Sequence, residues 1–451
     1  MLQFFTFRVS NLGLNLIILA MWLVLVAGCS SRPKIPGLEE QTEKLATVME
    51  KGGYAPSNAL QIASGKDVWM YEGSELEVMM TAPTAGGPYP LIIYLPSLGE
   101  NAEAGRLWRE TWAKAGYAVF SMQALAIGQA LKELGPERSG SKVKGGWLSS
   151  DEEDEDAVDE SHNDKRGEGV RKHSKSGRSS ELRYLGHEYF AADALKKRME
   201  QLFWAYQQLK IRIGLGVPLY AAADVSKVVL AGYDLGAQTV TAVLGEDFMT
   251  KLPSSSELQP LAALVLSPSI DLAEGNVHKR FQKLQLPLLV ITGSEDNDPY
   301  AISSASVRAA VWEFSPPGGK YLLSLTGNVH PLLAGANLGG GLIMDAGRDG
   351  DDAADKSRDG KRGGNLLELT NQYGGANSGR RHGGNSEGLF GGSKDGGERK
   401  NSDLGYKQVA AVYSISAAFL DAVVKNDEFA KFWIKDKAGD WLDRAGSLKI
   451  R

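Results

Sequence analysis

Short apolar runs recur along the chain and are separated by longer segments whose apolar residues have helical spacing. The apolar runs are residues 91–95, 117–122, 228–231, 261–266, 288–292 and 321–325. Runs of this length without polar alternation are typical of strands buried on both faces, as in parallel sheets. The segments with helical spacing are residues 103–115, 192–209 and 409–423. This alternation predicts an α/β fold with a doubly wound, mostly parallel sheet, preceded by a hairpin of residues 67–71 and 76–81.

Two segments contain too few apolar residues to pack in such a domain. Residues 135–180 include six consecutive acidic residues at 151–156, and like charges in a block repel one another. Residues 337–404 mix Gly, Asp, Arg and Ser with few apolar side chains. We therefore expect one domain over residues 61–445, interrupted by disordered insertions at these two places.

The N-terminal segment has the features of an export signal. Arg8 precedes an apolar stretch at residues 16–27, and Val-Ala-Gly then leads directly into Cys29. This sequence resembles the lipobox of bacterial lipoproteins, which implies that residues 1–28 are removed and that Cys29 is lipidated. A plain secretory signal and an uncleaved N-terminal membrane anchor are the alternatives.

The same resemblance implies a location. A lipid on Cys29 anchors the chain in the bacterial cell envelope, and residues 29–60 then form a tether and lead-in to the domain. Ser30, rather than Asp, follows the cysteine, which in a Gram-negative cell implies the periplasmic side of the outer membrane. After the N-terminus no apolar run reaches 18 residues, so we expect no further membrane span.

The bulk composition limits the classes of function. The chain has 451 residues, with 50 Lys and Arg against 55 Asp and Glu, and a net charge of −5. A nucleic-acid-binding protein usually carries a basic surplus, so this class is set aside. Cys29 is the one cysteine, which excludes an intramolecular disulfide and a cysteine-rich metal site. No phosphate-binding loop or metal-ligand cluster stands out, and we expect a small-molecule substrate with neither a metal nor a cofactor.

A glycine-framed turn follows the apolar run at 228–231. The sequence there is Gly232-Tyr233-Asp234-Leu235-Gly236, and a helical stretch comes after it. The frame resembles the nucleophile elbow of the α/β-hydrolase family, in which a tight turn between strand and helix presents the central side chain. That residue is usually serine, and here it is Asp234.

Two further landmarks of that family follow in the order nucleophile, acid, histidine. Asp296 and Asp298 come directly after the run at 288–292, where the family places its acid, and we expect Asp296 to fill that role, with Asp298 as the alternative. His330 comes after the run at 321–325, where the family places its histidine. The two acids have a second interpretation, since Asp and Asn before proline favour turns.

The backbone around Asp234 predicts an oxyanion hole. By the resemblance, the N–H groups of Leu98, after the first buried strand, and of Leu235 donate to the developing oxyanion. The chain looks closest to the dienelactone hydrolases and secreted esterases, through its Gly-x-x-x-Gly-Ala elbow and the Phe419-Leu420-Asp421 segment of the last helix.

Aspartate at the elbow changes the expected chemistry. An Asp nucleophile resembles that of haloalkane dehalogenases and epoxide hydrolases, in which the carboxylate forms an ester that water then hydrolyses. This implies that Asp234 is the nucleophile, that His330 is the base for the water step, and that Asp296 orients His330. The sequence departs from both groups, since Leu235 stands where the dehalogenases carry Trp, and residues 96–99 lack the His-Gly-x-Pro of the epoxide hydrolases.

The sequence therefore leaves two alternative functions. The first is a hydrolase of a small ester or related electrophile, for which Ser97 is a less favoured alternative nucleophile. The second is a non-catalytic envelope protein that uses the fold for binding. In the second, Asp234 is only a helix N-cap, because aspartate satisfies the free N–H groups of a first helical turn.

Overall fold

The computed structural model describes residues 37–56, 59–132, 134, 173–336 and 395–451. Within these residues nine strands form one sheet, in the order β1-β2-β4-β3-β5-β6-β7-β8-β9. The strands are β1 (Ile62–Tyr71), β2 (Ser74–Pro83), β3 (Tyr89–Leu95), β4 (Ala118–Ala124), β5 (Ala223–Tyr233), β6 (Pro260–Leu266), β7 (Leu288–Gly293), β8 (Lys320–Leu325) and β9 (Gly446–Ile450). Every predicted strand is present, and β9 is additional.

The centre of the sheet is parallel and its edges are antiparallel. Strands β4, β3, β5, β6, β7 and β8 run parallel to one another. The β1–β2 hairpin adds to β4 in the antiparallel direction, and β9 pairs antiparallel with β8 at the other edge. The predicted α/β class with a mostly parallel sheet is confirmed. The parallel strands all end on the same side of the sheet, so the loops that follow them lie close together.

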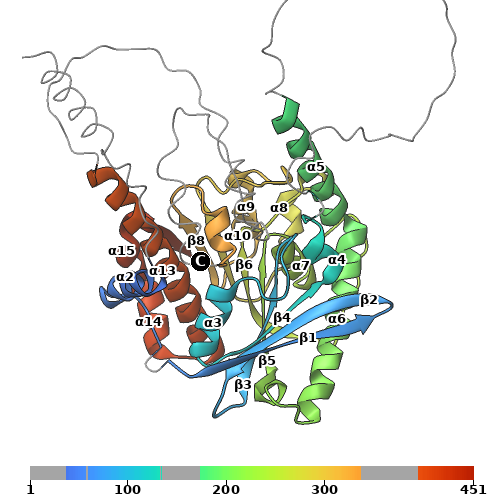
Figure 1. Ribbon diagram of the computed structural model, residues 1–451, viewed down its shortest axis with the longest axis horizontal. Coiled ribbons are helices and arrows are strands. Elements are labelled where there is room, and N and C mark those ends of the chain that lie inside the picture. The colour runs from blue at the N-terminus through green and yellow to red at the C-terminus, as the bar shows by residue number, and fades with distance from the viewer. Residues whose placement is uncertain (1–36, 57–58, 133, 135–172, 337–394) are drawn as a thin grey trace, which may run out of the picture.

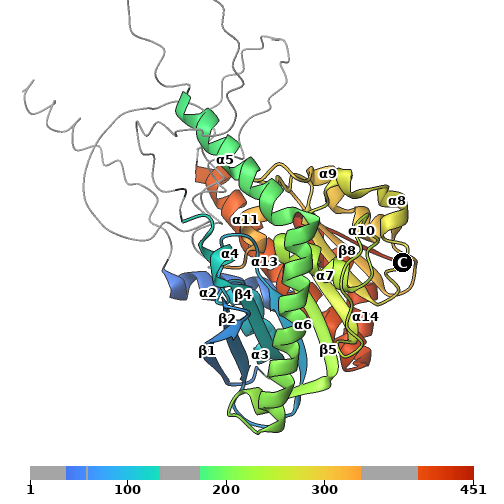
Figure 2. The same ribbon diagram turned by 90° about the vertical axis from the view of Figure 1, so that its right-hand side faces the viewer.

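Helices cover both faces of the sheet (Figures 1 and 2). One face carries α2 (Leu38–Glu50), α3 (Arg106–Lys114), α13 (Asp395–Val424), α14 (Glu428–Asp436) and α15 (Ala438–Leu442). The other carries α4 (Leu125–Gln129), α5 (His173–Phe190), α6 (Ala192–Gly214), α7 (Leu235–Val243), α8 (Val277–Arg280), α9 (Ala305–Arg308) and α10 (Ala310–Phe314). The four-residue helix α11 (His330–Leu333) follows β8. Each face therefore has its own hydrophobic core.

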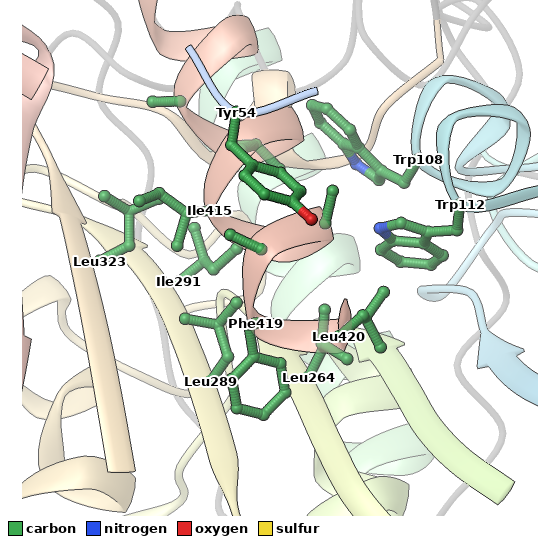
Figure 3. Close-up of a cluster of buried hydrophobic side chains, with 14 of the residues drawn as sticks. Tyr54, Trp108, Trp112, Leu264, Leu289, Ile291, Leu323, Ile415, Phe419 and Leu420 are labelled. Atoms are coloured by element: carbon green, nitrogen blue, oxygen red, sulfur yellow. The ribbon is translucent and has the colours of Figure 1, made fainter. Parts of the chain in front are cut away.

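Helix α13 forms the centre of the first core. Ile415, Phe419 and Leu420 of this helix pack with strand residues such as Leu264 and Leu289 (Figure 3). Within the described residues, 403–424 is the one helical segment long and apolar enough to cross a membrane, but 83% of its apolar window is buried inside the protein. We therefore assign it as a core helix of the domain.

Residues of the predicted lead-in belong to the domain. Leu45 of α2 and Tyr54 after it are buried in the core beside α13. The Tyr54 hydroxyl donates a 2.8 Å hydrogen bond to Asp421, which also accepts one of 2.9 Å from Tyr117. The predicted domain start at residue 61 is therefore too late by at least one helix.

Three other predicted boundaries also change so that the domain becomes larger. Helix α5 begins at His173 and α13 at Asp395, so the last residues of both predicted insertions are helical. Strand β9 extends the domain beyond residue 445, because it completes the sheet beside β8. The N-terminal segment with Cys29, and the remainder of both insertions, lie outside the described residues.

Candidate active site

The turn between β5 and α7 has a strained backbone. Asp234 has φ 51° and ψ −105°, a combination that residues with a side chain rarely adopt. Both framing glycines are required by close packing. A Cβ atom on Gly232 would lie 2.4 Å from the carbonyl carbon of Gly236, and a Cβ on Gly236 would lie 1.9 Å from the backbone oxygen of Leu95. The turn is thus held by its contact with the end of β3.

The carboxylate of Asp234 is fully buried and doubly hydrogen-bonded. The hydroxyl of Ser97 donates to Oδ2 at 2.6 Å, and the hydroxyl of Ser269 donates to Oδ1. The side chain makes no capping hydrogen bond to α7. The N-cap interpretation therefore does not describe this aspartate, whose carboxylate is held by loops that follow β3 and β6.

His330 and Asp296 form a buried pair. Nδ1 of His330 lies 2.9 Å from Oδ1 of Asp296. The hydroxyls of Ser267 and Thr292 donate to the other carboxylate oxygen at 2.7 and 2.8 Å. The imidazole is therefore fixed through one nitrogen, and in the part of the chain that the structure describes Nε2 has no hydrogen-bond partner.

Asp298, the other candidate acid, binds backbone N–H groups instead of the histidine. The carboxylate of Asp298 accepts hydrogen bonds from the backbone N–H groups of Tyr300, Ile302 and Ser303, at 2.7 to 2.8 Å. It thereby closes the turn after β7. Asp296 is thus the acid that meets the histidine.

Arg308 of α9 lies between the two carboxylates. Its Nη1 is 3.9 Å from Oδ1 of Asp234, and its Nε is 3.5 Å from Oδ1 of Asp296. Nη1 also donates to the backbone oxygen of Ser267 at 2.6 Å, and Nη2 is buried without a partner. Burial alone would raise the pKa of Asp296, but Arg308 and the hydrogen bond from His330 outweigh it and hold that pKa well below its usual range.

No hydrogen bond joins Asp234 to His330 within the described residues. The link between the elbow and the histidine runs through the neighbouring Tyr233. Its hydroxyl donates to the backbone oxygen of His330 at 2.8 Å, and the centres of the two rings are 5.2 Å apart. The elbow and the histidine are therefore neighbours that are anchored to each other.

Two backbone N–H groups beside Asp234 are free. Among the described residues, the N–H of Leu98 and the N–H of Leu235 make no hydrogen bond within the protein. The loop that carries Leu98 is fixed, because Nε2 of Gln123 donates to the backbone oxygen of Ser97 at 2.9 Å. Unpaired backbone donors of this kind are what an oxyanion hole requires.

Several groups that the sequence patterns did not indicate contact the candidate residues. Ser267 and Ser269 follow β6 just as Asp296 follows β7, so their position at a strand end is a signal in the sequence. Ser97, the alternative nucleophile, is a hydrogen-bond donor to Asp234. For Arg308 no sequence signal exists, since it lies in a four-residue helix far along the chain.

The described residues contain no group of three or more His, Cys, Asp and Glu side chains arranged to hold a metal ion. Comparison with known proteins finds no family model that matches this chain and no curated protein that matches it.

Proposed function

We propose that the chain is a hydrolase of the α/β-hydrolase type that acts on a small ester or related electrophile through Asp234, His330 and Asp296. The observation that carries the proposal is the strained turn at Asp234, with the unpaired N–H groups of Leu98 and Leu235 beside it. Backbone strain of this kind persists where the surrounding structure imposes it, and it is concentrated at functional sites. The His330–Asp296 pair, which follows β7 and β8, gives the base that such a site needs.

Each group has a role in a two-step reaction. A carboxylate oxygen of Asp234 attacks the electrophilic carbon, and the bond from that carbon to its leaving group breaks with the electron pair on the leaving group. The product is an ester at a saturated carbon or a mixed anhydride at an acyl carbon. His330 then removes a proton from water, the hydroxide attacks the carbonyl carbon of Asp234, and the bond from that carbon to the substrate oxygen breaks, which releases the product and restores Asp234. Asp296 stabilises the imidazolium, and the N–H groups of Leu98 and Leu235 hold the oxyanion.

Turnover by the purified protein tests the proposal. We would offer it short-chain chromogenic esters, epoxides and haloalkanes, and measure product release by wild type, His330→Ala and Asp234→Asn. Removal of a general base lowers the rate about 10²- to 10⁴-fold, and His330→Ala should lose at least this much of its rate. Asp234→Asn, which lacks the nucleophile, should lose at least as much. Product release that is unchanged in both variants would contradict the proposal.

A second candidate is a non-catalytic binding protein. Both carboxylate oxygens of Asp234 already accept hydrogen bonds, and Ser97, Ser269 and His330 are at most 4% exposed. A site that serves only to hold these loops together would have these properties. The absence of turnover with every class of electrophile, together with cooperative unfolding of both variants, would favour this candidate.

The lipid anchor is proposed separately, because Cys29 lies outside the described residues. We propose that Cys29 carries the lipid, and that the protein lies in a bacterial cell envelope, on the periplasmic side of the outer membrane if the cell is Gram-negative. Palmitate labelling of cells that express wild type or Cys29→Ser tests this. Label in wild type alone supports lipidation, and no label in wild type contradicts it.

A further inference from the structure

Glu100 is a buried acid that the mechanism above does not use. It lies in the loop after β3, and only 8% of the residue is exposed. Oε2 accepts a 2.9 Å hydrogen bond from the backbone N–H of Ser97, and Oε1 has no partner among the described residues. A carboxyl group this deeply buried without a cationic partner is costly to ionise.

Ser97 connects Glu100 to the elbow. Its N–H binds Glu100, and its hydroxyl binds Asp234. One residue therefore fixes both carboxyl groups relative to each other. The loop itself is held by Gln123, which donates to the Ser97 oxygen at 2.9 Å, and by Tyr300, whose hydroxyl donates to the Leu98 oxygen at 3.3 Å.

The surroundings of Glu100 favour its neutral form. Burial raises its pKa to about 8, the hydrogen bond from Ser97 opposes this rise, and the charge of Asp234 adds to it. The titratable neighbours from other elements are Tyr94 of β3, Tyr233 of β5 and Tyr300 after β7, and burial raises the pKa of each well above its usual value. At neutral pH Glu100 therefore carries a proton. A protonated carboxyl group that shares Ser97 with the elbow aspartate is suited to the role of an acid.

We propose that Glu100 is the catalytic acid that protonates the leaving oxygen when Asp234 attacks, and that the substrates are therefore small strained cyclic ethers rather than haloalkanes. This inference rests on the proposed function. A halide leaves without a proton, so a buried acid beside the nucleophile is useful only where the leaving atom is an oxygen.

The first step balances with these two residues. A carboxylate oxygen of Asp234 bonds to a ring carbon, the ring C–O bond breaks, and its electron pair stays on the oxygen. That oxygen takes the proton of Glu100. The products are a hydroxyalkyl ester on Asp234 and the carboxylate of Glu100.

The second step restores the site. His330 takes a proton from water, and the hydroxide adds to the ester carbon of Asp234. The alkoxide leaves and receives the proton from His330. Asp234 is left as a carboxylic acid, and its proton returns to Glu100 through solvent. The sum is one cyclic ether and one water converted to one diol.

The pH dependence of epoxide hydrolysis tests this role. With styrene oxide as the probe, kcat/KM of the full-length wild type should fall tenfold per pH unit above about pH 8, where Glu100 loses its proton. In Glu100→Gln, which keeps an acceptor for the Ser97 N–H, this fall should disappear and kcat/KM should be lower by about 10²- to 10⁴-fold. A matched alkyl chloride should be turned over more slowly than the epoxide or not at all, and any rate with it should lack the alkaline fall.

Glu103→Gln is the matched control, because Glu103 is an exposed acid three residues further along that pairs with Lys66. It should keep the wild-type rate and pH profile. Infrared spectra give a readout independent of turnover: a carboxylic-acid band should vanish from wild type as pH rises through about 8, and should be absent in Glu100→Gln.

The outcomes separate this inference from the proposed function. If Glu100→Gln turns over the epoxide at the wild-type rate, or with the same fall in kcat/KM above about pH 8, the role of Glu100 is overturned and the proposed function stands. The absence of that infrared band from wild type at neutral pH overturns the role of Glu100 as well. No turnover of any electrophile by wild type overturns both proposals.

Discussion

The hydroxyl of Tyr233 donates a 2.8 Å hydrogen bond to the backbone oxygen of His330. Tyr233 directly precedes the elbow aspartate, so one buried tyrosine connects the end of β5 to the segment after β8. The side chain of His330 is fixed from the other direction by Asp296. The position of the His330 imidazole relative to the elbow therefore depends on two hydrogen bonds. Tyr233 binds the backbone oxygen of His330, and Asp296 binds its ring.

Removal of the tyrosine hydroxyl should affect catalysis more than stability. Tyr233→Phe keeps the ring and leaves the His330 oxygen without its donor, which costs about 1 kcal/mol. We expect kcat to fall about tenfold, because small displacements of a catalytic group are costly. Urea unfolding and steady-state kinetics measure both quantities. A normal kcat together with a large loss of stability would mean that this hydrogen bond supports the fold alone.

The elbow glycine should not tolerate a methyl group. In Gly236→Ala the new Cβ would lie 1.9 Å from the backbone oxygen of Leu95, and a backbone atom cannot rotate away as the end of a flexible side chain can. We expect a loss of about 3 kcal/mol or more, or no folded protein, since overpacking of a rigid site costs at least this much.

Gly214→Ala is the control for this substitution. Gly214 ends α6, and a Cβ there meets nothing within 4 Å. Its replacement should leave stability unchanged or raise it by up to about 1 kcal/mol. Equal melting temperatures for the two alanine variants would contradict the packing described at the elbow.

Glu100 should make the protein less stable as pH rises. Its pKa is about 8 when folded, against about 4.3 for an unfolded glutamate, so between these values the folded state holds a proton that the unfolded chain releases. Stability is therefore lost as pH rises from about 4 to about 8. Glu100→Gln lacks this loss and should gain on wild type over that range, by up to about 5 kcal/mol at the upper end. Urea titrations at pH 5 and pH 8 measure the difference, and a gain that does not change with pH would contradict it.

Arg308 should be needed for both stability and acid resistance. Arg308→Met leaves the buried carboxylates of Asp234 and Asp296 without their cation, which costs about 3–5 kcal/mol near pH 7. The low pKa of Asp296 gives stability that is present above the unfolded value of about 3.9 and is lost as pH falls below it. The difference between variant and wild type should therefore shrink below about pH 4.

Arg280→Met removes a comparable buried cation that pairs with Glu246 rather than with Asp234 or Asp296. It should cost similar stability and leave the pH–rate profile unchanged. Arg308 instead lies beside Asp234 and Asp296, so only Arg308→Met should also change the pH–rate profile, and equal effects of the two arginine variants on that profile would contradict this role of Arg308.

The patterns that predicted the fold were those that depend on local sequence. Apolar runs located the six buried strands, and the turn at Glu72-Gly73-Ser74 located the hairpin. Strand β9 was missed because its sequence, GSLKI, is short and half polar, and it becomes a strand only through pairing with β8. The lead-in was assigned as a tether because its contacts with α13 are distant in sequence.

The candidate site was predictable where it follows strand ends. Asp234, Asp296 and His330 each come after a buried strand, and the structure brings their segments together. Nothing in the sequence distinguished Asp296 from Asp298, because that difference arises from three backbone N–H groups that turn towards Asp298. Ser97 and Ser269 also follow buried strands, so their place near the site was predictable, but their hydrogen bonds to Asp234 were not.

Trapping of the covalent ester is the most direct test of the central claim that Asp234 is a nucleophile. His330→Ala lacks the base for the water step, so an ester formed with an epoxide should persist. Mass spectrometry should then show an added mass equal to that of the substrate on the peptide that contains Asp234, and none in the double variant with Asp234→Asn. An adduct on Ser97, or no adduct from a substrate that wild type hydrolyses, would contradict the claim.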